Sequence, residues 1–325
     1  RQYRSRLSLA SKRTSGPLAN PSSMEPPERY RAIVDDFDAF RAACERPLPS
    51  AIRVNTIKAT VEDVRAALDE AGIAHEPVGW DESLFVLPET SPGANWPYFH
   101  GWIHGQEEVS AVPATVLDPQ PGERVWDACA APGSKATQLA ALMDDRGEVV
   151  ATDNNLGRIS ALRTNTERLG ATAIAVTHED ARNHTLKPFG GAEYDRALVD
   201  VPCSCEGTIR KNPDAFDEWD MSHVRGISGV QKDILERAVQ ATKPGGTVVY
   251  STCTFAPEEN EAVLDHVLDS EDCDLVDFDL ALDHREGVTE WQDEAFDPSV
   301  RKAKRIYPHF NDTGGFFCAK LEVGE

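Results

Sequence analysis

The stretch Arg124-Val-Trp-Asp-Ala-Cys-Ala-Ala-Pro-Gly-Ser-Lys135 decides the fold class of this chain. It joins a predicted strand at 124–127 to a predicted helix at 135–143. The small residues between them let backbone N–H groups approach a ligand, and the start of the helix favours a carboxylate there. Any turn from a strand to a helix needs small residues, so the turn alone is a weak signal. It lacks the pattern G-x-G-x-x-G, which argues against a dinucleotide site.

The alternation of strand and helix continues along the chain. We predict further strands at 148–152, 173–176, 196–199 and 247–251, and helices at 158–169, 230–241 and 258–268. Strands that alternate with helices indicate an α/β fold, with a parallel sheet and helices on both faces. Ligands of such sheets bind at the carboxyl ends of the strands.

Residues 24–97 follow a different pattern and are predicted to form a small α+β domain. Its predicted elements are a helix at about 29–44, a strand at 51–55, a helix at 61–71 and a strand at 83–87. The Pro- and Gly-rich stretch 88–97 is the expected boundary with a second domain, 98–325. Residues 1–23 are basic and contain no acid, and are expected to be a disordered leader, a transit peptide or a start placed upstream of Met24.

The charge of the chain bears on its partners. The 325 residues carry 33 Lys and Arg against 55 Asp and Glu, a formal net charge of −22. Such a surface would ordinarily argue against nucleic acid, because phosphate contacts need Lys and Arg. The acidic residues are spread along the whole chain, which favours adaptation to molar salt, where the Debye length falls to about 3 Å. We therefore expect a halophilic protein, whose net charge does not exclude RNA binding.

The composition also bears on the compartment. No run of 18 apolar residues is present, so neither a transmembrane helix nor a membrane partner is expected. The seven cysteines are scattered and odd in number, unlike a secreted disulfide framework. A cytoplasmic protein is therefore expected.

Two acidic residues follow the next strands of the predicted sheet. Asp153 ends the strand after the turn, where a ribose diol would be held. Asp180 follows the third strand and is suited to accept a hydrogen bond from an adenine amino group. Together with the turn at 127–135, this is the layout of an S-adenosylmethionine site.

Two cysteine-bearing segments follow the fourth and fifth strands. Asp200-Val-Pro-Cys-Ser-Cys205 places a carboxylate and a thiol where a pyrimidine edge could bind, and Tyr250-Ser-Thr-Cys-Thr254 brings Cys253 to the same edge of the sheet. The helix that begins just beyond Cys253 is expected to lower the pKa of this thiol and favour the thiolate.

A zinc site is the alternative interpretation of Cys203 and Cys205. It is disfavoured because the spacing is not C-x₂-C and no second Cys/His pair lies near in the sequence. No metal is therefore expected. Cys44, Cys273 and Cys318 are predicted to be small buried hydrophobes.

Several of these motifs resemble a known family. Cys129-Ala-Ala-Pro-Gly-Ser-Lys135, Pro202-Cys203-Ser204 and Ser251-Thr-Cys-Thr254 are similar to the three signatures of the RsmB-like (Sun-domain) RNA cytosine-5 methyltransferases. The resemblance extends to segments 53–58, 105–110, 305–309 and 313–317, in the right order. It covers about residues 30–322.

The resemblance implies a fold and a set of roles. The fold is a Rossmann-like class I S-adenosylmethionine-dependent methyltransferase sheet, preceded by a small α+β (RRM-like) domain. Cys253 would be the nucleophile, Cys203 the helper that releases the product, and Asp200 would lie between the methyl group and the base. The implied cofactor-binding residues are Cys129, Ala130, Ala131, Pro132, Gly133, Ser134 and Lys135 at the methionine end, Asp153 and Arg158 at the ribose, Asp180 at the adenine, and Asp200.

The implied activity is the formation of 5-methylcytosine in tRNA or rRNA, by a monomer, through a covalent bond between Cys253 and C6 of the base. Segment 206–212 is closer to the tRNA-modifying branch, and Cys205 stands where Gly is common in the family. Candidate phosphate contacts, or alternatively a solvated patch, are Arg210, Lys211, Arg301, Lys302, Lys304 and Arg305. The alternatives are a DNA cytosine-5 methyltransferase, in which the Pro-Cys thiol attacks, and a non-catalytic RNA-binding assembly factor.

Overall fold

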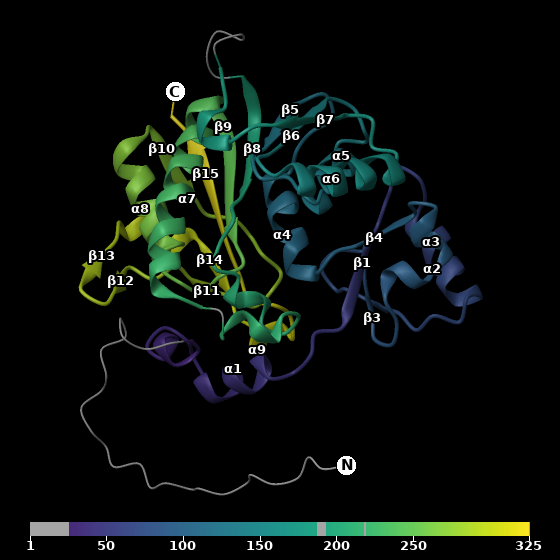
Figure 1. Ribbon diagram of the computed structural model, residues 1–325, viewed down its shortest axis with the longest axis horizontal. Coiled ribbons are helices and arrows are strands. Elements are labelled where there is room, and N and C mark those ends of the chain that lie inside the picture. The colour runs from purple at the N-terminus through teal and green to yellow at the C-terminus, as the bar shows by residue number, and fades with distance from the viewer. Residues whose placement is uncertain (1–25, 187–192, 218, 325) are drawn as a thin grey trace, which may run out of the picture.

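The computed structural model describes residues 26–186, 193–217 and 219–324, so the expected leader at 1–23 lies outside the described residues. A small antiparallel sheet follows the first helix, and a large mixed sheet occupies the centre of the molecule (Figure 1). No helix of the described residues has both the length and the apolar character needed to cross a bilayer.

The small sheet has the strand order β2-β3-β1-β4. Its elements are, along the chain, β1 (Ser50–Val54), α2 (Val61–Glu70), β2 (Glu76–Pro77), β3 (Leu84–Leu87), η3 (Pro92–Ala94), α3 (Trp96–Phe99) and β4 (Ile103–Gly105). The neighbouring strands are antiparallel. Ile52, Val64 and Phe85 contribute to a core between the sheet and its helix. This β-α-β-β-α-β unit is the small α+β domain that the sequence predicted.

The small sheet continues past the boundary expected at 88–97. That stretch connects β3 to α3, and β4 lies beyond it and pairs with β1. Proline and glycine mark a change of chain direction, but they do not reveal whether the next strand returns to the same sheet.

The segment before β1 packs away from the small sheet. Here η2 (Glu28–Tyr30) and α1 (Phe37–Cys44) lie against the C-terminal part of the chain, next to α9 (Pro308–Asn311) (Figure 1). The ring of Phe40 in α1 lies 5.2 Å from the ring of Phe255, centroid to centroid. Helical periodicity predicts this helix but not the surface on which it packs.

The large sheet has the order β11-β14-β15-β9-β8-β5-β6-β7, and β10 also pairs with β15. Its parallel strands are β5 (Arg124–Asp127), β6 (Glu148–Asp153), β7 (Ile174–His178), β8 (Tyr194–Asp200) and β9 (Thr242–Thr252). Antiparallel strands extend it beyond β9, namely β10 (Cys273–Val276), β11 (Arg285–Glu286), β14 (Lys304–Ile306) and β15 (Phe316–Val323). A separate hairpin is formed by β12 (Glu290–Trp291) and β13 (Glu294–Ala295).

Helices cover both faces of the large sheet, as predicted. They are α4 (Glu108–Leu117), α5 (Ser134–Leu142), α6 (Leu156–Leu169), α7 (Met221–Ala241) and α8 (Glu261–Ser270), with short 3₁₀ turns at η4 (Ala181–Asn183), η6 (Glu206–Thr208), η7 (Pro213–Ala215) and η8 (Pro298–Lys302). Helices α4, α5 and α6 share a core with Val125 and Val249. Helices α7 and α8 share another with Trp126 and Tyr250. Adjacent residues of one strand thus pack into the cores on opposite faces of the sheet, because strand side chains alternate between the two faces.

Candidate active site

Three loops meet where the strand order of the large sheet reverses. From β5, the strands β6 and β7 extend to one side, and β8 and β9 extend to the other. The carboxyl ends of the strands at such a point are the usual ligand site of an open α/β sheet. Here the loops after β5, β8 and β9 line a pocket of ≈ 260 Å³ that contains Cys129, Asp200, Cys203 and Cys253.

Three thiols gather in this pocket. The Cys203 Sγ lies 3.3 Å from the Cys253 Sγ and 3.9 Å from the Cys205 Sγ. Cys203 and Cys253 are half-buried, whereas Cys205 is exposed. The structure thus brings together the two thiols that the sequence singled out, from loops 50 residues apart, and places a third beside them.

A buried carboxylate, Glu206, holds the two cysteine loops together. It accepts hydrogen bonds from the Thr254 hydroxyl at 2.8 Å and from the Tyr30 hydroxyl at 2.6 Å. Next to it, the N–H of Gly207 donates to the carbonyl of Cys253 at 2.9 Å. The position of Cys253 is therefore fixed by the loop that follows β8 and by the N-terminal segment.

A second buried carboxylate, Glu259, supports the same loops from the other side. Its Oε2 accepts hydrogen bonds from the Ser204 N–H at 3.0 Å and from the Gln231 side chain at 2.8 Å. Burial raises the pKa of Glu259 to about 7. The Ser204 and Thr254 hydroxyls also lie 2.8 Å apart. The two loops form one bonded unit, so the spacing of their thiols is held by the fold.

The expectation that a helix end lowers the pKa of Cys253 is wrong. A hydrogen bond with Cys203 favours the thiolate, but Cys205, burial and the charge of Asp200 outweigh it and hold the pKa of Cys253 well above its ordinary value. Helix α8 begins only after Asn260, whose side chain bonds to the backbone and side chains of the neighbouring threonines rather than to the thiol. The surroundings of Cys253 therefore disfavour its thiolate in the resting pocket.

An ion pair lies beside the thiols. The Asp200 Oδ2 is 2.7 Å from the Lys135 Nζ, and the Ser251 hydroxyl donates to the Asp200 Oδ1 at 2.8 Å. Lys135 also donates to the Ser110 hydroxyl at 3.0 Å. Burial opposes the charge on Lys135, but Asp200 more than offsets it and raises the pKa of Lys135. The retained ammonium orients the Asp200 carboxylate in the pocket.

The predicted cofactor turn is divided between the pocket and the small domain. Cys129, Ala131 and Lys135 line the pocket, whereas Ala130, Pro132, Gly133 and Ser134 are not among its described lining residues. The Ser134 hydroxyl instead lies 2.9 Å from the His104 Nε2 of β4. The Arg53 guanidinium of β1 donates to the Thr137 hydroxyl at 3.0 Å. The small domain therefore packs on the start of α5. That the whole turn binds the cofactor stays a prediction.

Asp153 and Arg158 lie together at the end of β6, as the sequence predicted. The Asp153 Oδ2 is 3.4 Å from the Arg158 Nη1 and accepts from the Ala131 N–H at 3.3 Å. Arg158 also lines the pocket. Asp180 is paired differently, because the Arg182 guanidinium donates to both of its oxygens and lowers the pKa of Asp180. Its contact with an adenine group stays a prediction.

Comparison with known proteins decides the family. Residues 114–322 match the sequence profile of 16S rRNA methyltransferase RsmB/F, and residues 27–108 match that of the N-terminal domain of 16S rRNA methyltransferase RsmF. The chain belongs to the RsmB/F, or Sun-domain, family of RNA cytosine-5 methyltransferases. This confirms the family and the fold that the sequence motifs predicted.

Relatives of this methyltransferase differ in how much of their length it covers. It is 38% identical over 299 residues to the tRNA (cytosine(49)-C(5))-methyltransferase of Pyrococcus abyssi. The alignment covers 90% of this chain and 94% of that protein. It is also 38% identical to the ribosomal RNA small subunit methyltransferase F of Shewanella loihica, over 88% of this chain but only 58% of that protein. The crystal structure of a methyltransferase homologue from Pyrococcus horikoshii has a TM-score of 0.78 at 33% identity, over 88% of this chain and 90% of that one.

Asp127, which ends β5 and opens the turn at 127–135, is a buried carboxylate for which the sequence motifs predicted no separate role. Asp127 is 1% exposed, and neither carboxylate oxygen accepts a hydrogen bond of good geometry from the described residues, although the Cys129 N–H lies close enough to favour the charged form slightly. Burial, reinforced by Asp200 and opposed by Lys135, raises the pKa of Asp127 to about 7. A buried carboxylate without a well-formed hydrogen bond fits a ligand that brings a positive charge. The signal that could have found it is its place directly before the turn.

The residues present fit S-adenosylmethionine. Asp127 would pair with the ammonium group of its methionine end, and the start of α5 would favour its carboxylate. Asp153, which already accepts from backbone N–H groups, would accept from the ribose hydroxyls. The pocket itself holds the groups that would act on a base.

We expect Asp127→Asn to weaken S-adenosylmethionine binding by about 1.5–3 kcal/mol, the usual worth of a hydrogen bond to a charged group. The carboxylate must be ionised to pair with an ammonium, and its pKa in the free pocket is about 7. Wild-type affinity should therefore fall by up to about tenfold per pH unit below that pKa and level off above it. Calorimetry across this range measures both effects. Asp153→Ala is the control, expected to weaken binding while keeping the pH dependence, and an Asp127→Asn variant that kept it would contradict the assignment.

Most of the candidate phosphate contacts turn out to have structural partners. Arg305 is buried and pairs with Glu261, and Lys304 pairs with Asp277. Arg210 donates to three backbone carbonyls. Lys302 is exposed and donates to the carbonyl of Leu275. Lys211 and Arg301 are also exposed, and each forms an ion pair, with Glu107 and with Glu286. Charge in the sequence does not reveal these partners.

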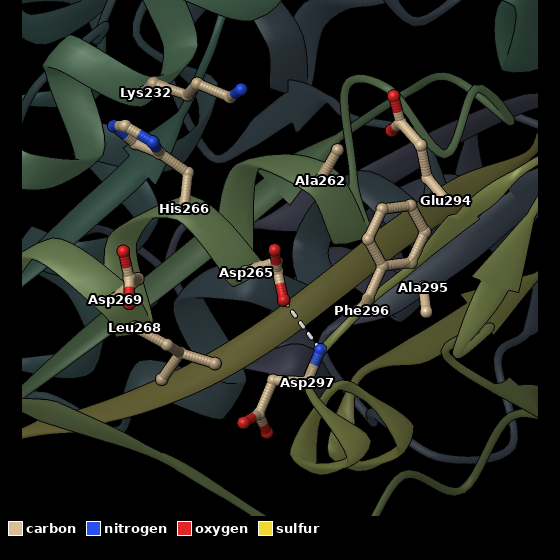
Figure 2. Close-up of a pocket in the computed structure, with 10 residues that line it drawn as sticks. All are labelled: Lys232, Ala262, Asp265, His266, Leu268, Asp269, Glu294, Ala295, Phe296 and Asp297. Carbon is tan, nitrogen blue, oxygen red and sulfur yellow. Dashed lines mark hydrogen bonds between the residues drawn. The ribbon is translucent and has the colours of Figure 1, made fainter.

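A second hollow lies elsewhere on the methyltransferase, beside α8 and β13 (Figure 2). Its walls include His266, Asp269 and Glu294, and the Asp297 N–H donates to the Asp265 side chain at 2.6 Å. None of its lining residues borders the pocket of the three thiols. It presents surface carboxylates without a thiol or an unpaired buried group, and it has no part in the site.

Proposed function

We propose that this protein transfers a methyl group from S-adenosylmethionine to C5 of a cytosine in RNA, with Cys253 as nucleophile and Cys203 as the group that assists release. The observation that carries the proposal is the 3.3 Å approach of the two Sγ atoms in a pocket shared with Asp200. Two thiols and a carboxylate at one strand edge are what covalent activation of a pyrimidine requires. The target base must leave its stack to reach them.

Attack begins with the Cys253 thiol. C5 of cytosine is a poor nucleophile, and addition of a thiolate to C6 raises its electron density. Because the pKa of Cys253 is raised, its proton must pass to solvent as the cytosine binds, and the hydrogen bond from Cys203 supports the thiolate that remains. Asp200, oriented by Lys135, would accept from the amino edge of the base and stabilise the adduct.

Release requires the reverse of this attack. S-adenosylmethionine, when bound, supplies the methyl group that C5 accepts. A proton acceptor then removes the proton from C5 of the cytosine. The electron pair of that C–H bond restores the C5–C6 double bond, and the C6–Sγ bond to Cys253 breaks. Cys203 lies next to the sulfur that leaves and would assist this step.

The RNA class that we propose is tRNA. The Pyrococcus abyssi tRNA methyltransferase is covered over 94% of its length, whereas the bacterial rRNA methyltransferase is covered over 58%. The two domains described here thus match nearly the whole length of a tRNA enzyme.

The substrate is tested by transfer of labelled methyl groups to purified tRNA, 16S rRNA and double-stranded DNA from one organism. We expect label in tRNA as 5-methylcytosine, and little in the other two. Label in DNA would favour the alternative in which the Pro-Cys thiol attacks, label in rRNA alone would overturn the tRNA assignment, and label in none would support a non-catalytic role.

We further propose that the protein works in a reducing, salt-rich cytoplasm. All of its cysteines are free, including a pair 3.3 Å apart, and the chain has a net charge of −22. In dilute buffer this charge repels itself, and salt screens the repulsion. The melting temperature is expected to rise steeply between low and molar KCl. A melting temperature that does not depend on salt would contradict the halophilic assignment.

A further inference from the structure

We propose that Cys203, Cys205 and Cys253 form a binding site for a thiophilic divalent metal ion, with zinc as the best fit, and that a metal bound there blocks methyl transfer. The binding site stands on the geometry of the thiols alone. The block rests on the proposed role of Cys253 as nucleophile.

The spacing of the three sulfurs matches metal coordination. With a zinc–sulfur distance of about 2.3 Å, tetrahedral geometry places the thiolates about 3.8 Å apart. The two measured separations are 3.3 and 3.9 Å, and all three Sγ atoms lie within 4.8 Å of one another. Shifts of up to about 1 Å complete one face of a tetrahedron, and side-chain rotation supplies such shifts.

The sequence argued against zinc because Cys203 and Cys205 have no second pair nearby in the chain. The fold supplies the third ligand from another loop, since Cys253 follows β9. Both loops are fixed to each other through Glu206 and through the hydroxyl pair of Ser204 and Thr254. A site held by a bonded frame loses little freedom when an ion binds.

The charge balance also suits a cation. With all three ligands present as thiolates, a divalent ion and its ligands carry a net charge of −1. The Lys135 ammonium lies close enough to interact with Cys253 and offsets this charge. Thiolate ligands select zinc and other soft ions and disfavour magnesium and calcium. Because Cys205 is exposed, the ion reaches the site from solvent and keeps one position open for water.

Binding of metal and attack on a base exclude each other. A Cys253 Sγ lone pair that is shared with a metal is not free to add to C6 of cytosine. The same atom thus serves two competing partners, which makes the metal a reversible inhibitor that a chelator removes.

The test measures binding apart from activity. Full-length reduced protein is titrated with Co²⁺, whose visible and charge-transfer bands report tetrahedral thiolate ligation, and then with Zn²⁺ in competition. We expect one metal per chain, and a loss of affinity of at least about 100-fold in Cys205→Gly, because even outer partners of a metal site are worth up to about that factor. Cys205 has a positive φ of 61°, so glycine relieves backbone strain and the variant should fold.

Controls distinguish the site from other cysteines. Cys273→Ser removes a thiol on β10 outside the pocket and should bind metal as the wild type does. Equal affinity in Cys205→Gly and wild type, or a loss in Cys273→Ser alone, would overturn the site.

For each protein, inhibition is read from the rate of methyl transfer with metal divided by the rate of the same protein without metal. Zinc should inhibit the wild type reversibly, at concentrations at least about 100-fold lower than are needed for Cys205→Gly, in line with the two affinities. If the thiolate bands form and methyl transfer continues unchanged, the block is overturned and the role of Cys253 as nucleophile fails with it. If no bands form, the metal site fails and the proposed function is untouched.

Discussion

Cys253→Ala is expected to abolish both methyl transfer and every covalent complex with RNA, whereas Cys203→Ala is expected to accumulate such a complex. The two Sγ atoms lie 3.3 Å apart, so either sulfur could reach the same base, and position alone does not separate their roles. If Cys253 attacks C6, its loss removes the first step, and the rate should fall by at least about 10⁴-fold, as for other nucleophiles. If Cys203 acts only in release, its loss lets attack and methylation proceed and then stalls the enzyme on its product.

The measurement is denaturing electrophoresis of each variant with labelled RNA. The double variant Cys203→Ala/Cys253→Ala should resemble Cys253→Ala, because release is irrelevant without attack. Cys205→Ser is the matched control, since it changes the third thiol of the pocket and is expected to trap no RNA. A complex that forms in Cys253→Ala but not in Cys203→Ala would reverse the assignment and favour the mechanism of the DNA enzymes.

Asp200→Asn is expected to lower methyl transfer by about 10²–10⁴-fold, the range of a group that handles protons or charge in the transition state. Its carboxylate lies in the pocket and is held by Lys135 and Ser251. Asparagine keeps the shape and can still accept from the Ser251 hydroxyl, but it does not carry the negative charge. Lys135 keeps its bond to Ser110, so the fold should persist.

Single-turnover methyl transfer and S-adenosylmethionine affinity, measured together, test this prediction. The control is Ser251→Ala, which removes one hydrogen bond to Asp200 and should cost about tenfold at most. Asp200→Asn with an unchanged single-turnover rate would remove Asp200 from the chemistry. A loss confined to cofactor affinity would assign it to binding.

The sequence predicted the five parallel strands of the large sheet and helices α5 to α8, because their periodicities are regular and their turns contain glycine or proline. It did not predict the antiparallel strands β10 and β11, which are only four and two residues long. It did not predict α4, whose residues are apolar around most of the helix and include Pro113. Such a segment has no clear helical stripe, because it is buried between the sheet and α5.

The candidate site was only partly predictable for a related reason. Sequence order showed that Cys203 and Cys253 follow neighbouring strands, and so lie at one edge. It could not show that the Asp127 carboxylate has no well-formed hydrogen bond, nor that burial and Asp200 raise the pKa of Cys253. Both depend on which groups surround an atom in three dimensions, and the chain assembles those surroundings from distant segments.

The position of the segment before β1 bears on the order in which parts of the protein fold during synthesis. The Tyr307 hydroxyl donates to the carbonyl of Ile33, 274 residues earlier, and Tyr30 reaches Glu206, 176 residues later. The small sheet has mostly local pairings and can form early, whereas contacts between distant segments form late. The segment before β1 therefore completes its packing only after the residues around Tyr307 have been synthesised. Because the Tyr30–Glu206 bond supports the loop of Cys253, the frame of the three thiols forms late in folding, after the small sheet.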